Sequence, residues 1–199
     1  IDSENEIGIL KLKQWSFSYA TNAKTIILPN SLTTIESQVF QENKKLQQLK
    51  IGENVSNIDP IFKYSNYSGN VIIDSNNEHY TVENNILYDK NKSKLISVLG
   101  EINGEFNIND NVKEIGDYAF HGQKKMTSVN IPSSVYKIGG AFNYCEFNTI
   151  NIPESVKTIS NWCFGNNSKL DKIKVNKKEN TILGAPWGAI KGMRIVEWK

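Results

Sequence analysis

Apolar residues recur along the chain in a fixed order and at a nearly constant spacing. Each copy holds a short stretch of strand-like alternation, a proline or turn residue, a Val-x-x-Ile pair and then a phenylalanine. The clearest copy runs over residues 126–142 as MTSVNIPSSVYKIGGAF. Equivalent positions are separated by 21 or 23 residues, as in Leu28 and Ile51, and later in Ile108, Ile131, Ile152 and Val175. A near-constant period of this size predicts a solenoid of stacked supersecondary units.

The spacing inside one copy predicts which side chains face the core. In the strand that contains Leu49 and Ile51, alternation with period two sends these two side chains to one face and their polar neighbours to the other. The Val-x-x-Ile pair and the phenylalanine then point inward from the second and third sides. Because one copy is too small to bury its own apolar face, stacking has to create the core. The sequence therefore predicts a ladder of inward rings at Phe40, Phe62, Phe120, Phe142 and Phe164.

The repeat organises the chain as a single domain over residues 1–199. About six repeats are expected over residues 25–175, and the stretch near 73–107 is long enough to be one enlarged repeat. Residues 1–24 do not follow the repeat, and we expect them to form an N-terminal cap over the open end of the core. The pattern thins over residues 176–199, which are expected to form a C-terminal cap.

Several copies resemble one known family over whole segments. These segments are IPSSVYKIGGAF at 131–142, INDNVKEIGDYAF at 108–120, IPESVKTISNWCF at 152–164 and LPNSLTTIESQVF at 28–40. They are similar to the BspA-type leucine-rich repeat of Gram-positive bacterial surface proteins. HYTVENNILYDKNKSKLI at 79–96 resembles the long variant of that repeat, and APWGA at 185–189 resembles a terminal element of such proteins. The resemblance covers residues 25–199.

The resemblance implies a right-handed, horseshoe-like leucine-rich-repeat solenoid. Such a solenoid is mainly β with short helical or 3-10 turns, and its parallel strands stack along its length. The family is associated with attachment to host or matrix partners, and it supplies no catalytic residue, since the matching residues are core positions. Two departures affect local geometry only: Phe62 does not follow a small residue, and the copy at 131–152 is short.

Composition and charge narrow the classes of partner. The chain has a formal net charge of +2, and Arg194 is the only arginine among its 23 basic residues. Nucleic-acid-binding domains show a clustered basic face, so no nucleic acid is expected as a partner. No apolar run approaches the roughly 20 residues of a membrane-spanning helix, so no transmembrane segment is expected. The first residues lack a signal-peptide pattern, and a start at Ile1 indicates a mature or excised fragment.

Two cysteines, Cys145 and Cys163, are too few for a disulfide framework and have no metal-ligand spacing. We expect two free buried thiols, since free cysteine behaves as a small apolar residue. A bridge between the neighbouring repeats that hold them is the alternative.

Little in the sequence indicates catalysis, a metal or a cofactor. His79 and His121 have no second ligand at metal spacing. The segment 89–100 opens like a calcium loop but lacks the glycine at its sixth position and the glutamate at its twelfth. Its first residues, Asp89–Ser93, lie between two apolar runs and predict a hairpin turn. Because no nucleophile elbow, zinc-protease or phosphate-loop motif occurs, we expect no enzyme activity and no cofactor.

Two sets of surface residues are candidates for binding. The outward residues of the stacked first strands line the concave face of such a solenoid; the candidates there are Gln48, Lys50, Ser128, Asn130, Thr149, Asn151, Lys172 and Lys174. A plain solvated face is the alternative, because binding hot spots favour Trp, Tyr and Arg. The second set holds aromatics that are expected to be exposed: Tyr64, Tyr67, Tyr80, Tyr118, Trp162 and Trp187. For Trp187 a place within the C-terminal cap is the first interpretation, and a binding role is the alternative.

These observations predict a non-catalytic extracellular interaction module, from a protein that is secreted or associated with the cell surface or cell wall. The expected partner is a host or matrix protein or a glycan, bound by a monomeric domain. One alternative is a structural spacer or self-associating segment of the cell surface. Another is an accessory repeat domain of a larger secreted enzyme.

Overall fold

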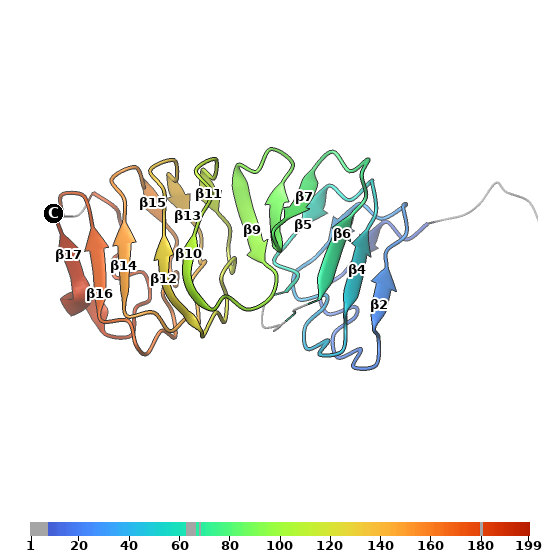
Figure 1. The fold of residues 1–199 in the computed structure, drawn as a ribbon, viewed down its shortest axis with the longest axis horizontal. Coiled ribbons are helices and arrows are strands. Elements are labelled where there is room, and N and C mark those ends of the chain that lie inside the picture. Colours follow the sequence, from blue (N-terminus) through green and yellow to red (C-terminus); the bar gives the residue numbers. More distant parts are fainter. Residues whose placement is uncertain (1–7, 63–66, 68, 180) are drawn as a thin grey trace, which may run out of the picture.

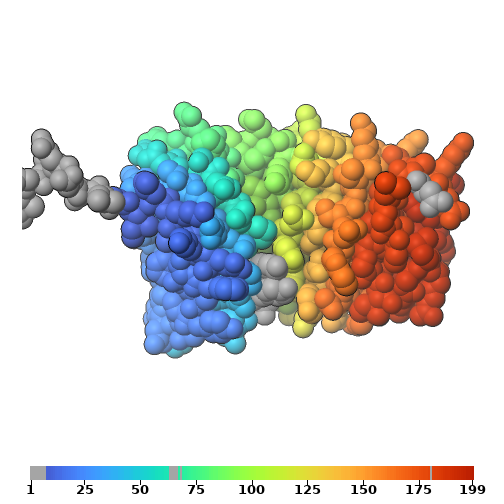
Figure 2. Space-filling view, turned by 180° about the vertical axis from the view of Figure 1, so that it is seen from behind, coloured from blue at the N-terminus to red at the C-terminus, as the bar shows by residue number. Residues whose placement is uncertain are grey.

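The computed structural model describes residues 8–62, 67, 69–179 and 181–199. The chain winds as a mainly-β solenoid of about eight stacked turns, and successive coils advance along the long axis of the molecule (Figure 1). From behind, the coils follow one another in the same order from blue to red (Figure 2). The predicted fold class is confirmed.

One long side of the solenoid, which faces the viewer in Figure 1, carries the first strand of each coil and is called the front face. Its strands are β2 (Thr25–Ile27), β4 (Gln48–Ile51), β6 (Asn70–Ile73), β10 (Gly104–Asn107), β12 (Met126–Asn130), β14 (Thr149–Ile152), β16 (Lys172–Val175) and β17 (Val196–Trp198). All pairs are parallel, and they divide into three sheets in the orders β2-β4-β6, β10-β12 and β14-β16-β17. Thr149 lies opposite Lys172, 23 residues away, so the strand register follows the sequence period.

The second side consists of two-residue strands that contain the isoleucine of each Val-x-x-Ile pair, or the leucine in the first coil. They are β1 (Lys11–Leu12), β3 (Thr34–Ile35), β5 (Asn57–Ile58), β11 (Glu114–Ile115), β13 (Lys137–Ile138) and β15 (Thr158–Ile159). These strands also pair in parallel. Both members of the pair face the core, and Val135 and Ile138 expose no surface. The predicted inward orientation of the pair is confirmed.

The repeat begins earlier in the chain than the sequence pattern indicates. Residues 1–24 were expected to lie outside the repeat, but β1 pairs with β3, with Leu12 opposite Ile35 at the usual 23-residue offset. Phe17 stacks on Phe40 with ring centroids 6.1 Å apart and is therefore a further rung of the ladder. Among the described residues, the first coil has a neighbouring coil on one side only. Its outer side chains are therefore exposed, and its apolar pattern is incomplete.

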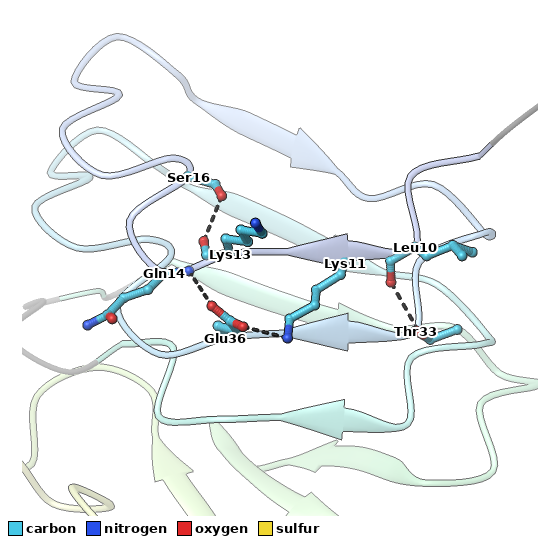
Figure 3. A network of polar contacts seen from close by, with 7 residues as sticks. All are labelled: Leu10, Lys11, Lys13, Gln14, Ser16, Thr33 and Glu36. Atoms are coloured by element: carbon cyan, nitrogen blue, oxygen red, sulfur yellow. Dashed lines mark hydrogen bonds and ion pairs between the residues drawn. The ribbon is translucent and has the colours of Figure 1, made fainter.

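Polar contacts tie this first coil to the second (Figure 3). Glu36 accepts a hydrogen bond from the backbone N–H of Gln14 at 2.8 Å and forms an ion pair with Lys11 Nζ at 2.6 Å. The contact with Lys11 first, and then that with Gln14, lowers the pKa of the Glu36 carboxyl below its usual value. At the other end of β1, Thr33 Oγ1 donates to the carbonyl oxygen of Leu10 at 3.0 Å. Side-chain contacts therefore attach the first coil to the second, in addition to the pairing of β1 with β3.

The third side is a series of turns that carry the phenylalanine ladder. Phe40, Phe120, Phe142 and Phe164 expose no surface, and Phe62 exposes 7%. The ring centroids of Phe120 and Phe142 are 5.0 Å apart, and those of Phe142 and Phe164 are 6.0 Å apart. The ladder that the sequence predicts is confirmed within each half of the chain.

A buried polar side chain follows three residues after several of the ladder rings. Asn43 Nδ2 donates to the carbonyl oxygen of Phe17 at 2.9 Å, and Asn167 Nδ2 donates to that of Phe142 at 2.7 Å. Each contact gives a backbone carbonyl of the preceding coil a partner inside the core, where an unpaired carbonyl would be costly.

Both cysteines are free and buried, as expected. Cys145 takes the place of the asparagine in its turn, with its Sγ 3.0 Å from the carbonyl oxygen of Phe120. Burial raises the pKa of the Cys163 thiol to about 12, and it raises that of Cys145 as well. Both thiols are therefore protonated at neutral pH.

The enlarged repeat adds an antiparallel meander to the second side. Its strands are β7 (Tyr80–Glu83), β8 (Ile86–Asp89) and β9 (Lys94–Val98), and β9 pairs in parallel with β11. The predicted hairpin turn is confirmed: the Asp89 carboxylate accepts from the Ser93 hydroxyl at 2.6 Å and from the N–H of Lys94 at 2.7 Å. A second turn, at Asn84 and Asn85 with φ of 50° and 59°, joins β7 to β8.

The buried apolar residues form two clusters, one on each side of the enlarged repeat. Strand β8 contributes to both of them. Because side chains alternate along a strand, Leu87 packs in the N-terminal cluster, while Ile86 and Tyr88 pack in the C-terminal cluster. The meander therefore joins the two halves of the core.

The solenoid ends with a 3-10 helix, η1 (Gly192–Ile195), and strand β17. Val175 lies opposite Trp198, again at the 23-residue offset. Trp187 exposes no surface, and its ring centroid lies 6.2 Å from that of Phe164 and 6.1 Å from that of Trp198. Trp187 therefore extends the ladder into the last coil.

Candidate ligand-binding cleft

The candidates on the front face lie where strand alternation predicts them. Their places are the outward positions of β4, β12, β14 and β16, and all are at least partly exposed: Gln48, Lys50, Ser128, Asn130, Thr149, Asn151, Lys172 and Lys174. Lys172 forms an ion pair with Glu197 at 2.7 Å. These side chains are spread over three separate sheets, so they do not converge on one point.

The aromatic candidates separate into different environments. Trp162 exposes 69% of its surface, as predicted. Tyr67 and Trp187 expose 5% and 0%, so their predicted exposure is wrong. The reason is that both rings add to the ladder: Tyr67 stacks on Phe62 with centroids 4.5 Å apart and an interplanar angle of 9°. Tyr64 lies outside the described residues.

Tyr80 is half-buried and takes part in the fold. Its hydroxyl accepts a hydrogen bond from the N–H of Ile58 at 3.0 Å and donates to the carbonyl oxygen of Ser56 at 3.1 Å. The hydroxyl thus pairs with the outer edge of β5, where the meander interrupts the series of parallel strands. Burial raises the pKa of Tyr80, so this hydroxyl stays protonated at neutral pH.

A cleft of about 610 Å³ lies between the coils that precede and follow the enlarged repeat. Its aromatic lining consists of Phe62, Tyr67, Tyr118, His121 and Tyr144. The cleft brings together two of the predicted candidates, Tyr67 and Tyr118. It adds His121 and Tyr144, which the sequence pattern does not mark as binding residues.

The cleft exists because the ladder is interrupted at the enlarged repeat. On the N-terminal side the ladder ends with the stacked pair of Phe62 and Tyr67. On the C-terminal side it begins with Phe106, which packs edge-on against Phe120 at 5.4 Å. Between them the residues 97–100 supply no ring to the lining. Because no aromatic ring from residues 97–100 fills the space between the two halves of the ladder, a cleft remains there.

One wall of the cleft is a row of rings from two adjacent turns. The ring of His121 contacts Tyr118 edge-on at 5.8 Å and Tyr144 edge-on at 5.2 Å. Tyr118 and Tyr144 both have a φ of 57°, a left-handed conformation that is uncommon for residues other than glycine. Tyr144 exposes 41% of its surface, and Tyr118 is half-buried. The wall therefore presents aromatic surface that a ligand can reach.

Hydrogen bonds fix the segment that crosses the cleft. Gln123 Nε2 donates to the carbonyl oxygen of Gly100 at 2.8 Å, and Gln123 Oε1 accepts from the N–H of Ile102 at 2.8 Å. The N–H of Gly100 donates to the carbonyl oxygen of Tyr67 at 3.0 Å. Burial raises the pKa of Tyr67 to about 12, so its hydroxyl is protonated and donates to the carbonyl oxygen of Asn70 at 3.0 Å. The segment is thus bonded to both halves of the solenoid.

Charged side chains complete the lining. Glu42 and Glu101 contribute carboxylates, which form ion pairs with Lys44 at 3.2 Å and with Lys125 at 2.8 Å. Lys124 adds a further ammonium group. The cleft therefore offers aromatic faces beside hydrogen-bond acceptors and donors, an arrangement typical of sites that bind a ligand with one apolar face and polar edges.

The described part of the chain holds no group of three or more His, Cys, Asp or Glu residues placed to bind a metal ion. No helix in that part is long and apolar enough to cross a membrane. The carboxylate of Asp89, the first residue of the calcium-like segment, is engaged within its own hairpin turn.

Comparison with models of protein families identifies the repeat. The model of the BspA type leucine-rich repeat region matches residues 4–103 and 100–185, with six copies. The chain belongs to this family. The resemblance inferred from the repeat segments is therefore confirmed, and the match includes part of the N-terminal segment. BspA-type repeats are typically non-catalytic.

Solved structures share the fold of this BspA-type chain. A leucine-rich repeat protein from Eubacterium ventriosum matches with a TM-score of 0.65 and 22% identity, over 85% of this chain and 58% of that one. A leucine-rich cell surface protein from Faecalibacterium prausnitzii matches with a TM-score of 0.62 and 22% identity, over 97% and 58%. The pneumococcal vaccine antigen PcpA matches with a TM-score of 0.60 and 17% identity, over 86% and 55%.

At these identities the likeness shows the fold alone. The chain spans less than two thirds of the length of each of these three proteins. A search of curated proteins gave no match.

Proposed function

We propose that this chain is a non-catalytic binding module of a bacterial surface protein. Its partner is a host or matrix protein or a glycan, and the domain engages it as a monomer outside the cell. Membership of the BspA-type repeat family supports the assignment to a binding class, and the fold resembles that of a bacterial cell surface protein and of a pneumococcal vaccine antigen.

The observation that carries the proposal is the aromatic cleft. Tyrosine supplies a large, rigid contact area at low cost in conformational entropy, and for that reason it is enriched in binding sites. Here Tyr118 and Tyr144 are fixed by the contact of each with His121, so little ordering is needed on binding. The front face has fewer features of this kind, since its candidates are mostly short and polar. We therefore place the binding site in the cleft.

The test is a binding measurement with the whole chain and a double variant, Tyr118→Asn with Tyr144→Asn. Asparagine tolerates the left-handed backbone at both positions, so the turns are preserved while the rings are lost. Panels of immobilised matrix proteins and of glycans are the binding partners. We expect saturable binding to a member of one panel, and a loss of at least about tenfold in affinity in the variant, since two aromatic contacts with the bound partner are lost.

Trp162→Asn is the matched control. Trp162 also has a left-handed backbone, with a φ of 63°, and it is exposed but does not line the cleft. The control variant should bind as the unchanged chain does. Unchanged binding by the double variant would place the site elsewhere. The absence of saturable binding on both panels would contradict the proposal and favour a structural spacer.

A further inference from the structure

The front-face strands form three sheets, so no ladder joins β6 to β10 or β12 to β14 among the described residues. Strands β12 and β14 belong to adjacent coils, whereas the whole enlarged repeat interrupts the front face between β6 and β10. Strand β6 is the last strand of the sheet β2-β4-β6, and β10 is the first of the sheet β10-β12. The coil between them contributes the meander to the second side instead of a further parallel strand, so β6 ends its sheet in the middle of the solenoid (Figure 1).

The backbone of β6 has hydrogen-bonding groups that point away from its sheet. Asn70 donates its N–H to the carbonyl oxygen of Gln47 at 2.7 Å, and Asp74 donates to that of Ile51 at 2.9 Å. In a parallel ladder, alternate residues bond to opposite sides of the strand. The N–H and C=O groups of Val71 and Ile73 therefore point away from β4, toward the interruption.

A groove of about 570 Å³ runs along this free edge. One side of it is residues 70–75. The other is formed by residues 80–82 of β7, by Asn84 and Asn85 of the turn that follows, and by Lys90. Ile73, Tyr80 and Val82 are partly buried apolar residues that pack against the N-terminal cluster. The groove thus combines backbone donors and acceptors in strand register with an apolar inner surface.

The free edge of β6 is short, with four residues, but it lacks most of the other features that usually prevent pairing with another chain. Edge strands are normally protected by proline, by inward charges, by lysine on the strand or by a bulge. Residues 70–73 read Asn-Val-Ile-Ile, without a charge or a proline, and the pairing of β6 with β4 is regular. The edge is therefore open to a further strand.

We propose that the free edge of β6 is a site of β-strand addition, which takes an extended segment of a partner polypeptide as a fourth strand of the sheet β2-β4-β6. Backbone groups of the segment pair with Val71 and Ile73, and its inward side chains contact Ile73 and Val82. The segment therefore has apolar residues at every second position. This site is separate from the aromatic cleft and does not depend on the function proposed for it.

The test uses a peptide that copies residues 169–176, KLDKIKVN, with blocked termini. In the solenoid these residues include β16, which pairs with β14 in the geometry that a further strand would have on β6. Lys172 and Asn176 donate their N–H groups to carbonyl oxygens of the preceding coil. NMR of the labelled chain follows amide shifts and hydrogen exchange during titration. We expect saturable shifts in β6 and slower exchange of the Val71 and Ile73 amides. The control peptide carries N-methyl groups at the positions of Lys172 and Lys174 and should have no effect.

A pair of variants tests the backbone contact directly. Ile73→Pro removes one outward N–H without removing a bond to β4, since proline is tolerated on a strand edge whose N–H faces outward. Ile73→Val keeps the N–H and is the matched control. The peptide should bind the proline variant at least about tenfold more weakly, the order expected for one lost backbone hydrogen bond. Unchanged thermal midpoints show that both variants are folded.

Three results would overturn the proposal. The first is saturable binding that N-methylation or Ile73→Pro leaves unchanged. The second is the absence of any shift in β6 up to the solubility limit of the peptide. The third is concentration-dependent protection of the same amides without peptide, which would show that the occupant is a second copy of this chain.

Discussion

The inward rings are the residues on which the stability of the stack depends most. Phe142 exposes no surface and contacts Phe120, Phe147 and Phe164 within 6.0 Å between centroids. Phe142→Ala removes these contacts and leaves a cavity, because the coils around it are hydrogen-bonded to each other on the second and third sides and have little freedom to collapse into it. We expect a loss of about 3–5 kcal/mol in the free energy of unfolding, measured by urea denaturation.

Tyr136→Ala is the control for the ring substitution. Tyr136 is 39% exposed in the same coil, and its main polar contact is a hydrogen bond to Glu114 at the surface. Its loss should change the free energy of unfolding by no more than about 1 kcal/mol. An equal effect of the two substitutions would show that the ladder does not carry the stability of the coil.

The carboxyl of Glu36 makes the first coil sensitive to acid. Its pKa is lowered in the folded chain, mainly by the contact with Lys11 and next by the N–H of Gln14. A group with a depressed folded pKa adds stability above its unfolded pKa, and this stability is lost as the pH falls through the folded value. The protection factors of the amides in residues 10–20, which correct for the pH dependence of intrinsic exchange, should therefore fall below about pH 4.5, the usual pKa of a glutamate.

Glu36→Gln should remove most of this acid dependence, because its side chain does not titrate. In this variant the amides of the first coil should exchange faster than those of the unchanged chain at pH 7. At low pH the two proteins should exchange at similar rates. A first coil that opens with the same pH profile in both proteins would exclude Glu36 as the cause.

The sequence predicts inward residues well where they repeat and poorly where they do not. Phe40 and Phe164 follow the period, and their burial was predicted correctly. Tyr67 belongs to the same ladder but stands five residues after Phe62, off the period, so it was taken for an exposed aromatic. Trp187 follows Phe164 by 23 residues, the repeat period, but GAPWGA replaces the usual phenylalanine turn there, so its place in the ladder was missed. Tyr144 was missed although its backbone has the same left-handed conformation as that of Tyr118: it stands two residues after a ladder ring, whereas Tyr118 and Trp162 stand two residues before one.

Among the structural elements, the meander is anchored by one buried side chain. Asn77 exposes no surface, and its Nδ2 donates to the carbonyl oxygens of Gly52 at 3.0 Å and Val55 at 2.9 Å. Its Oδ1 accepts from the N–H groups of His79 at 2.9 Å and Tyr80 at 2.8 Å. The amide thus joins the preceding coil to the start of β7 with four hydrogen bonds.

Asn77→Ala should destabilise the chain on the order of 3 kcal/mol, since it leaves several buried backbone groups without partners. Asn76→Ala is the matched control, because Asn76 is exposed and its side chain makes one long contact of 3.5 Å with Glu53. Urea denaturation measures the free energy of unfolding of both variants. Equal stability of the two would show that the amide does not anchor the meander.

The sequence shows the hairpin of the enlarged repeat but not the interruption of the front face. Apolar runs around Asp89–Ser93 predicted one turn correctly. The pair Asn84–Asn85 is also a turn signal, since asparagine tolerates the left-handed backbone of a tight hairpin. Residues 104–107 were not recognised as a front strand, because GEFN lacks the apolar alternation of the other copies. The free edge of β6 and the aromatic cleft both result from this irregular coil.

At the scale of the whole molecule, the irregular coil divides a quasi-one-dimensional core. In a solenoid each coil contacts its neighbours only, so stability is close to a sum of local terms. The described core consists of two clusters, and β8 supplies Leu87 to one and Ile86 and Tyr88 to the other. Strand β9 also contributes to both, with Leu95 in the C-terminal cluster and Ile96 packed against the N-terminal one, so the coupling between the two halves depends on the meander strands β8 and β9.

Leu87→Ala should separate the unfolding of the two halves. It removes a fully buried side chain from the N-terminal cluster, which lowers the free energy of unfolding by about 2–5 kcal/mol. Ile86 and Tyr88 remain in the C-terminal cluster. Hydrogen exchange with mass spectrometry at increasing urea should then show the N-terminal coils opening before the C-terminal coils. Leu170→Ala, in the C-terminal cluster, is the control and should reverse the order. If each substitution lowered protection equally along the whole chain, the two clusters would form one cooperative unit, and the interruption would be a local feature of the surface.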